Sequence, residues 1–152
     1  MTLAIPRFDA HGYLEPGVHR CNFQELESLL GWNESRRHLL RQLQQFIDER
    51  LLPEFGLLPP LVLDGHFVTR HDHPREIVAV VLMDELEEES FWHAAELCQH
   101  YEALRCRYQV RLFVHTDSSG INALGRIQGI DPCELLEKNL YHQHTKGVVR
   151  LH

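Results

Sequence analysis

The sequence lacks the features of a secreted or membrane-inserted protein. Its amino-terminal MTLAIPRFDAHGYLEPG contains no apolar run long enough for a signal peptide or a membrane span. The four cysteines are far apart and form no Cys-x-x-Cys motif, which indicates reduced thiols; they are Cys21, Cys98, Cys106 and Cys133. We therefore expect a soluble, cytoplasmic protein that is not attached to a membrane.

An excess of basic residues is also lacking. The chain has 15 lysines and arginines against 22 aspartates and glutamates, which gives a formal net charge of −7. Non-specific binding to nucleic acid or to anionic lipid requires the opposite sign of charge on one face. The composition therefore argues against nucleic acid and membranes as partners and favours a basic protein partner.

Common motifs for nucleophilic catalysis and phosphate binding are absent as well. The chain has no Gly-x-Ser-x-Gly elbow, and Gly125 and Gly129 in GRIQG are too isolated to form a phosphate loop. With 152 residues, of which 43% are hydrophobic, it is long enough for one domain with a core and too short for two. We expect a single domain over residues 1–152.

Two helices are predicted in the amino-terminal half by capping residues and helical spacing of leucines. Asn22 is expected to cap a helix that Gly31 ends, and Asn33 a longer helix that runs to Leu51 and ends near Pro53. The polar face of the longer helix is expected to be a solvated surface, formed by Arg36, Arg37, Arg41, Asp48 and Glu49.

Strand patterns follow, so the chain predicts an α+β fold with a sheet flanked by helices. Strands are expected at 61–63, at 77–83, where the run is apolar enough to be buried on both faces, and at 108–116. KGVVRLH at the carboxyl terminus is expected to be a strand or an extended tail. Further helices are expected after the capping residues Ser90 and Asp131.

Residues 1–21 are interrupted by prolines and glycines, so we expect an ordered arm without regular structure. Phe8, Tyr13 and Val18 would anchor this arm, because apolar side chains are costly to leave in water. We expect them to pack on the core of the same chain. Packing against a second subunit, in a homo-oligomer, is the alternative.

Residues 64–80, DGHFVTRHDHPREIVAV, carry the strongest functional signal. The order of a strand, a glycine, a short turn and a second strand resembles the nucleotidyltransferase superfamily that includes DNA polymerase beta. More narrowly, IPRFDAHGYLEPGVHR, DGHFVT and KGVVRL resemble a group of uncharacterised bacterial proteins of that superfamily. The resemblance implies a minimal nucleotidyltransferase fold with a mixed sheet. It also implies a Gly-Ser pair for the triphosphate and three aspartates for two divalent metal ions.

Position by position, the resemblance implies a degenerate site. Gly65 is kept, but His66 stands at the serine position, and these two residues are the candidate nucleotide contacts. Glu76 and Val78 occupy the positions of the paired aspartates, and Arg111 that of the third. A single carboxylate beside a guanidinium is a poor host for Mg²⁺. We therefore expect no metal cofactor and no functional catalytic residue.

We hypothesise that Glu76 and Arg111 form an ion pair across adjacent strands, in place of the metal ions. The alternative is that each side chain extends separately into solvent. The resemblance then implies a catalytically silent domain that acts as a protein-binding module. Because the superfamily contains antitoxins, a role in toxin neutralisation or phage defence follows by analogy.

Two alternatives use the same segment. An active enzyme would bind Mg²⁺ or Mn²⁺ with a nucleoside triphosphate, with His66 as phosphate ligand or general base and carboxylates recruited from Glu76, Asp72, Asp64 or Asp117. A zinc-stabilised structural protein would instead use the ligand set His66, His71, His73 and Glu76, close to Asp72. His142 and His144 are expected to be polar loop residues.

Overall fold

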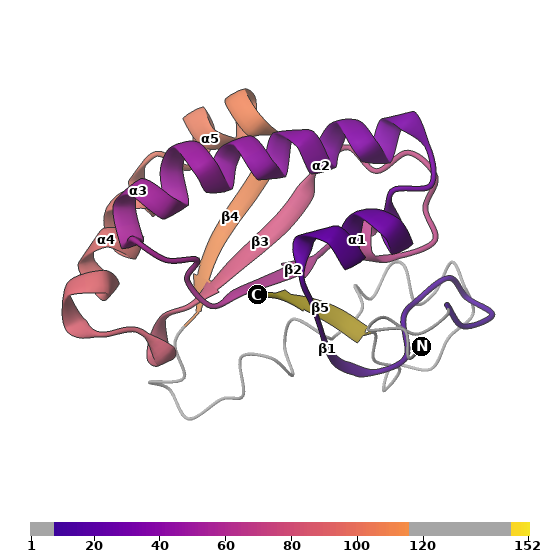
Figure 1. Cartoon of the computed structure of the whole chain (residues 1–152), viewed down its shortest axis with the longest axis horizontal. Helices are drawn as coiled ribbons and strands as arrows, with labels where there is room; N and C mark the ends of the chain where they lie inside the picture. The colour runs from indigo at the N-terminus through magenta and orange to yellow at the C-terminus, as the bar shows by residue number, and fades with distance from the viewer. Residues whose placement is uncertain (1–7, 116–146) are drawn as a thin grey trace.

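The computed structural model of the chain describes residues 8–115 and 147–152. These residues form a mixed five-stranded sheet with helices packed on it, which confirms the predicted α+β class (Figure 1). The strands are β1 (Gly17–Cys21), β2 (Leu61–Asp64), β3 (Ile77–Leu82), β4 (Val110–His115) and β5 (Gly147–Leu151). The helices are α1 (Phe23–Leu30), α2 (Glu34–Phe46), α3 (Leu52–Phe55), α4 (Glu88–Gln99) and α5 (Tyr101–Tyr108).

The sheet has the strand order β1-β5-β2-β3-β4. The outer pairs, β1 with β5 and β3 with β4, are parallel, whereas β2 is antiparallel to both of its neighbours. Asp64 lies opposite Val78, and Val78 lies beside Arg111. Residues paired in this way project toward the same face of a sheet, so these three side chains share one face.

The two faces of the sheet have different coverings. The main core joins buried residues of α1, α2, α4 and α5 to the first face of the sheet, which includes Leu63, Ala79 and Leu112. The second face carries a smaller cluster, formed by Val62, Val80, Leu82 and Val148. Val78 packs against this smaller cluster. The described helices therefore cover the first face (Figure 1), and the candidate site residues lie on the second.

The helix boundaries follow the capping rules with two corrections. Asn22 and Asn33 cap α1 and α2 as predicted. Pro53 does not end the second helical segment, because a proline is tolerated in the first turn of α3, and Gly56 with φ +76° ends it instead. Ser90 is not a cap; α4 begins at Glu88. Figure 1 shows α2 continuing toward α3 through the π-helical turn Ile47–Leu51.

The strand predictions are confirmed at β2 and β3, and β3 is buried on both faces. The strand predicted at 108–116 begins later, at Val110, because Tyr108 ends α5 and Gln109 has a φ of +56°. KGVVRLH provides β5, which lies inside the sheet between β1 and β2. The helix expected from Asp131 lies outside the described residues.

The arm is partly regular, which corrects one expectation. Gly17–Cys21 forms the edge strand β1, paired with β5. The expectation that the arm packs on its own core is confirmed: Tyr13 is buried, Phe8 contacts the main core, and Val18 packs against the smaller cluster. Within the described residues, no helix combines the length and the apolar character needed to span a lipid bilayer.

Candidate functional site

A cleft of about 570 Å³ opens where β2 ends and where β3 and β4 begin. The five residues of the predicted degenerate site all line it, namely Gly65, His66, Glu76, Val78 and Arg111. They meet because β3 lies between β2 and β4, so a turn after one strand and the starts of the other two are brought to one place. The rest of the described lining consists of His71, His73, Pro74 and Arg75.

Gly65 is required by the backbone and by close packing. Its φ of +81° lies in the region that favours glycine, and a Cβ atom built on it would lie 2.9 Å from Cγ2 of Val78. A short 3₁₀ turn, His66–Val68, follows it directly. Because Gly65 has no side chain, the turn lies closer to Val78, in the floor of the cleft, than it could with any other residue at position 65.

Glu76 lies between two arginines. Its Oε1 is 3.8 Å from Nη1 of Arg111, so the hypothesised ion pair is present, although at long range. Its Oε2 accepts a shorter hydrogen bond of 2.9 Å from Nε of Arg105, on α5, a partner that the sequence does not predict. The Nε of Arg111 donates to the hydroxyl of Tyr101 at 3.1 Å. Among the described residues that line the cleft, Glu76 is the only acidic one, and both of its carboxylate oxygens contact a guanidinium group.

His66 and His71 lie on one side of the cleft, with ring centroids 5.0 Å apart. Nδ1 of His71 accepts the backbone N–H of His73 at 3.1 Å, which requires that nitrogen to be unprotonated. Burial, together with the charges of His66, Arg36 and His73, lowers the pKa of His71. His71 is therefore held as a neutral imidazole over more of the pH range than a free histidine.

The zinc ligand set suggested by the sequence is not drawn together in the described residues. The group of three histidine or acidic side chains whose ligand atoms all lie within 4.8 Å of one another is elsewhere, at Glu54, His93 and Glu96. His66, His71, His73 and Glu76 line the same cleft, but no three of them form such a group.

The carboxylates that an active enzyme would recruit are also dispersed. Oδ1 of Asp72 accepts the indole N–H of Trp32 at 3.1 Å, and Asp72 is not among the residues that line the cleft. Asp64 is opposite Val78 in the sheet but is not among the residues that line the cleft. Asp117 lies outside the described residues, as do Gly125, Gly129, Cys133, His142 and His144.

Arg36 holds the loop that forms the histidine side of the cleft, which corrects its assignment to a solvated surface. Its side chain is fully buried, stacked 3.7 Å from the centroid of the Trp32 ring. The guanidinium donates to five backbone carbonyls, those of Leu30, His66, Phe67, Thr69 and His71. Burial lowers the pKa of Arg36 to about 10, so it stays charged at neutral pH.

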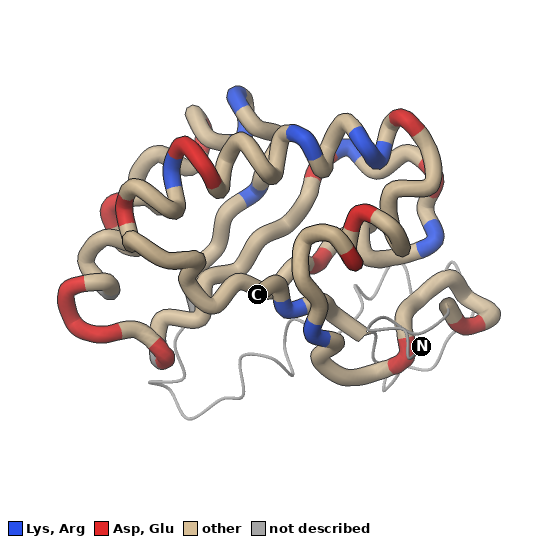
Figure 2. The backbone as a smooth tube through the Cα atoms, viewed as in Figure 1, with Lys and Arg blue, Asp and Glu red and all other residues tan. Residues whose placement is uncertain are grey.

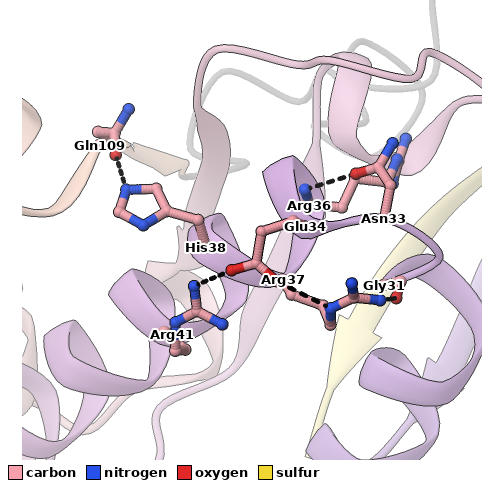
Figure 3. A network of polar contacts seen from close by, with 8 residues as sticks. All are labelled: Gly31, Asn33, Glu34, Arg36, Arg37, His38, Arg41 and Gln109. Carbon is pink, nitrogen blue, oxygen red and sulfur yellow. Dashed lines mark hydrogen bonds and ion pairs between the residues drawn. The ribbon is translucent and has the colours of Figure 1, made fainter.

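The spacing of the sequence contains a signal for this burial. Arg36 precedes Leu39, Leu40 and Leu43 by three, four and seven residues, which places it on the apolar stripe of α2 and not on the polar face. The other arginines of α2 behave as expected. Figure 3 shows Arg37 and Arg41 both reaching Glu34, and all three side chains are exposed to solvent.

A second hollow adjoins the cleft and shares Pro74 and Arg75 with it. Figure 3 shows His38 of α2 hydrogen-bonded to the side-chain oxygen of Gln109 at 2.9 Å. The amide group of Gln109 donates to the carbonyl of Arg75, and its backbone carbonyl accepts from Ile77. Gln109 therefore ties α2 to the start of β3, where Glu76 and Val78 lie.

The comparisons with known proteins identify one family. A family model described as "Family of unknown function (DUF6932)" matches residues 6–152. Because the match spans nearly the whole chain, the protein belongs to this family. Neither the curated proteins nor the solved structures yield a match. The interpretation of the cleft therefore depends on its own geometry.

Proposed function

We propose that this member of the DUF6932 family is a catalytically silent nucleotidyltransferase-like domain that acts by binding and not by nucleotidyl transfer. The observation that carries this proposal is the position of Arg111. It lies beside Val78 on adjacent parallel strands, at a cleft where Glu76, the one carboxylate in the described lining, already contacts two guanidinium groups. In the resembling superfamily, these strand positions supply the metal ligands.

Electrostatics supports metal-independent binding at this cleft. Two unit charges of like sign about 4 Å apart repel by about 4 kcal/mol at an effective dielectric constant of about 20, and a divalent ion doubles this cost. Arg111 and Arg105 would each impose this cost on a metal ion held by Glu76. The same guanidinium groups would attract a phosphate group. The cleft in this proposal therefore accepts an anion directly, without a bridging metal ion.

The partner in this proposal is a basic protein in the cytoplasm, met by the acidic surface that the net charge of −7 provides. Toxin neutralisation or phage defence is the setting that the resemblance suggests, by analogy of fold. Nucleic acid and membranes are not partners in this proposal.

The test is a calorimetric titration of the untagged protein with ATP, GTP, CTP and UTP, each with and without Mg²⁺ or Mn²⁺. We expect any binding to be unaffected by the metal ions and to be lost in Arg111→Gln. Arg20→Gln is the matched control, since Arg20 is an exposed arginine on the distant edge strand β1. The proposal would be overturned if a nucleotide bound only in the presence of metal ions. It would also be overturned if the protein transferred a nucleotidyl group from a labelled nucleotide to another protein.

A further inference from the structure

A second group of titratable side chains lies away from the cleft, between α3 and α4. Glu54 belongs to α3, and His93 and Glu96 belong to α4. Their ligand atoms all lie within 4.8 Å of one another. Oε1 of Glu54 is 2.7 Å from Nδ1 of His93, and the ring of Phe55 packs edge-on against the imidazole at a centroid distance of 6.2 Å. We call these three residues the α3–α4 trio.

The trio is preorganised by local structure. His93 and Glu96 are three residues apart on a helix, a spacing that places side chains on one face. Leu97 and Ala94 of α4 are buried, so packing fixes the direction in which that face points. α3 and α4 contact each other directly, and Figure 1 shows them at the same end of the sheet. A single small ion could therefore reach ligands from both helices.

The donor set selects a class of metal. One imidazole nitrogen with two carboxylates suits Zn²⁺ and similar divalent transition metals, whereas Mg²⁺ and Ca²⁺ prefer oxygen ligands alone. Three protein ligands leave a fourth position for water. Glu96 is exposed, so its carboxylate has room to close the separation to the distances of about 2.0–2.2 Å that zinc requires.

The surroundings also attract a cation. Glu87, Glu88 and Glu89 precede the trio at the start of α4, and Figure 2 shows the acidic stretch that leads into this helix. Such a concentration of one sign of charge raises the local concentration of cations. In the cleft, by contrast, arginines lie within 4 Å of the lining carboxylate.

We propose that Glu54, His93 and Glu96 form a site for a divalent transition metal ion of the zinc class, which joins α3 to α4. Binding would exchange the hydrogen bond between Glu54 and His93 for two metal–ligand bonds and add a third from Glu96. Because the ligands come from two helices, bound metal would stabilise the folded chain. This proposal does not depend on the function proposed for the cleft.

The experiment uses untagged, chelator-treated protein. Zn²⁺ binding is measured by calorimetry and by the rise in melting temperature, and Co²⁺ is used as a spectroscopic probe of nitrogen ligation. We expect one equivalent of Zn²⁺ to bind and to raise the melting temperature. His93→Gln and Glu96→Gln should each weaken binding at least tenfold. Glu96 is exposed, so its variant should fold normally whether or not His93→Gln does.

Matched controls address the other histidines and glutamates of this acidic, histidine-rich chain. His100→Gln and Glu27→Gln remove exposed residues of the same types outside the trio and outside the acidic stretch before it, and they should leave zinc affinity unchanged. The proposal is overturned if the unaltered protein does not bind one equivalent of zinc. It is also overturned if the trio variants bind zinc as tightly as the two controls do.

Discussion

The cleft and the α3–α4 trio contain the same side-chain types, imidazole and carboxylate, but their electrostatic settings are opposite. In the cleft, Glu76 is bound by Arg105 and lies close to Arg111. In the trio, Glu54 accepts a hydrogen bond from a histidine beside a second glutamate. The difference teaches that neighbouring charges decide whether such residues suit an anion or a cation. Residue type alone does not decide it.

The largest effect, a loss of stability, is expected from replacing Arg36, the arginine that supports the cleft but not the α3–α4 trio. Arg36→Met would leave five backbone carbonyls without their buried donor, since the guanidinium binds them all. We expect the free energy of unfolding to fall by about 3–5 kcal/mol. Urea unfolding followed by circular dichroism measures the change.

Arg37→Met is the control for this substitution, because Arg37 is exposed and paired only with surface groups. It should cost no more than about 1 kcal/mol. Equal losses in the two variants would mean that the burial of Arg36 contributes nothing specific. Where Arg36→Met remains folded, nucleotide binding should be lost, whereas zinc binding at the trio should persist.

The cleft should bind a cation if it is given the carboxylates that it lacks. In the double variant Val78→Asp with Arg111→Asp, two carboxylates would lie beside each other on β3 and β4, near Glu76. We expect this variant to acquire measurable Mn²⁺ affinity, because carboxylates offset the charge of the ion. Calorimetry or the paramagnetic relaxation of water detects the binding.

Val18→Asp with Arg20→Asp makes the same two replacements on the edge strand β1, where Val18 packs against the same smaller cluster as Val78. It should not bind Mn²⁺. If the cleft variant binds no more Mn²⁺ than this control, the alignment of Val78 and Arg111 with metal-binding positions is wrong.

A smaller effect is expected from Glu76→Gln. This change removes a negative charge that competes with an incoming anion for Arg105 and Arg111. We expect the affinity for inorganic phosphate to rise by about threefold to tenfold, as for one added unit of favourable charge near a surface. Glu85→Gln is the control, because Glu85 also pairs with an arginine, Arg150, outside the cleft. If the affinity for phosphate did not change, Arg105 and Arg111 would not be the anion site.

The smallest effect concerns pH. The folded-state pKa of His71 is lowered, mainly by burial, so the unfolded chain binds the proton more readily. The contribution of His71 to stability is therefore complete above the unfolded pKa of about 6.5 and is lost as pH falls below it. His71→Gln should reduce the loss of urea resistance between about pH 7.5 and about pH 5.5. His100→Gln, which removes a histidine outside the cleft, is the matched control.

The residues of the cleft could be predicted better than the contacts within it. Strand periodicity and turn chemistry are local signals that predicted the strands and the turn, and the resemblance to nucleotidyltransferases then brought Gly65, Glu76, Val78 and Arg111 together. The partner of Glu76 could not be predicted in this way. Arg105 reaches it from α5, and such a contact depends on how a helix docks on the sheet.

Dependence on how distant segments pack also explains why the burial of Arg36 and the α3–α4 trio could not be predicted. Helical spacing puts Arg36 on the apolar stripe, but its charge favours assignment to the polar face, because a buried arginine is rare without partners. Four of the five carbonyls that it binds belong to the distant loop 66–71, and backbone carbonyls leave no mark in the sequence. The α3–α4 trio unites residues from two helices, whereas the histidines close together in the sequence did not form such a group.

The placement of β5 inside the sheet has a consequence for how the chain is made. Gly17–Cys21 pairs with Gly147–Leu151, and the same strand also pairs with β2. A nascent chain that has already passed β4 therefore still exposes the unpaired edges of β1 and β2. Pairing over such long sequence separations is slow, and exposed strand edges invite association with other chains. The sheet is thus completed only after β5 has been synthesised, and until then a chaperone or an early-binding partner that covers these edges would improve the yield.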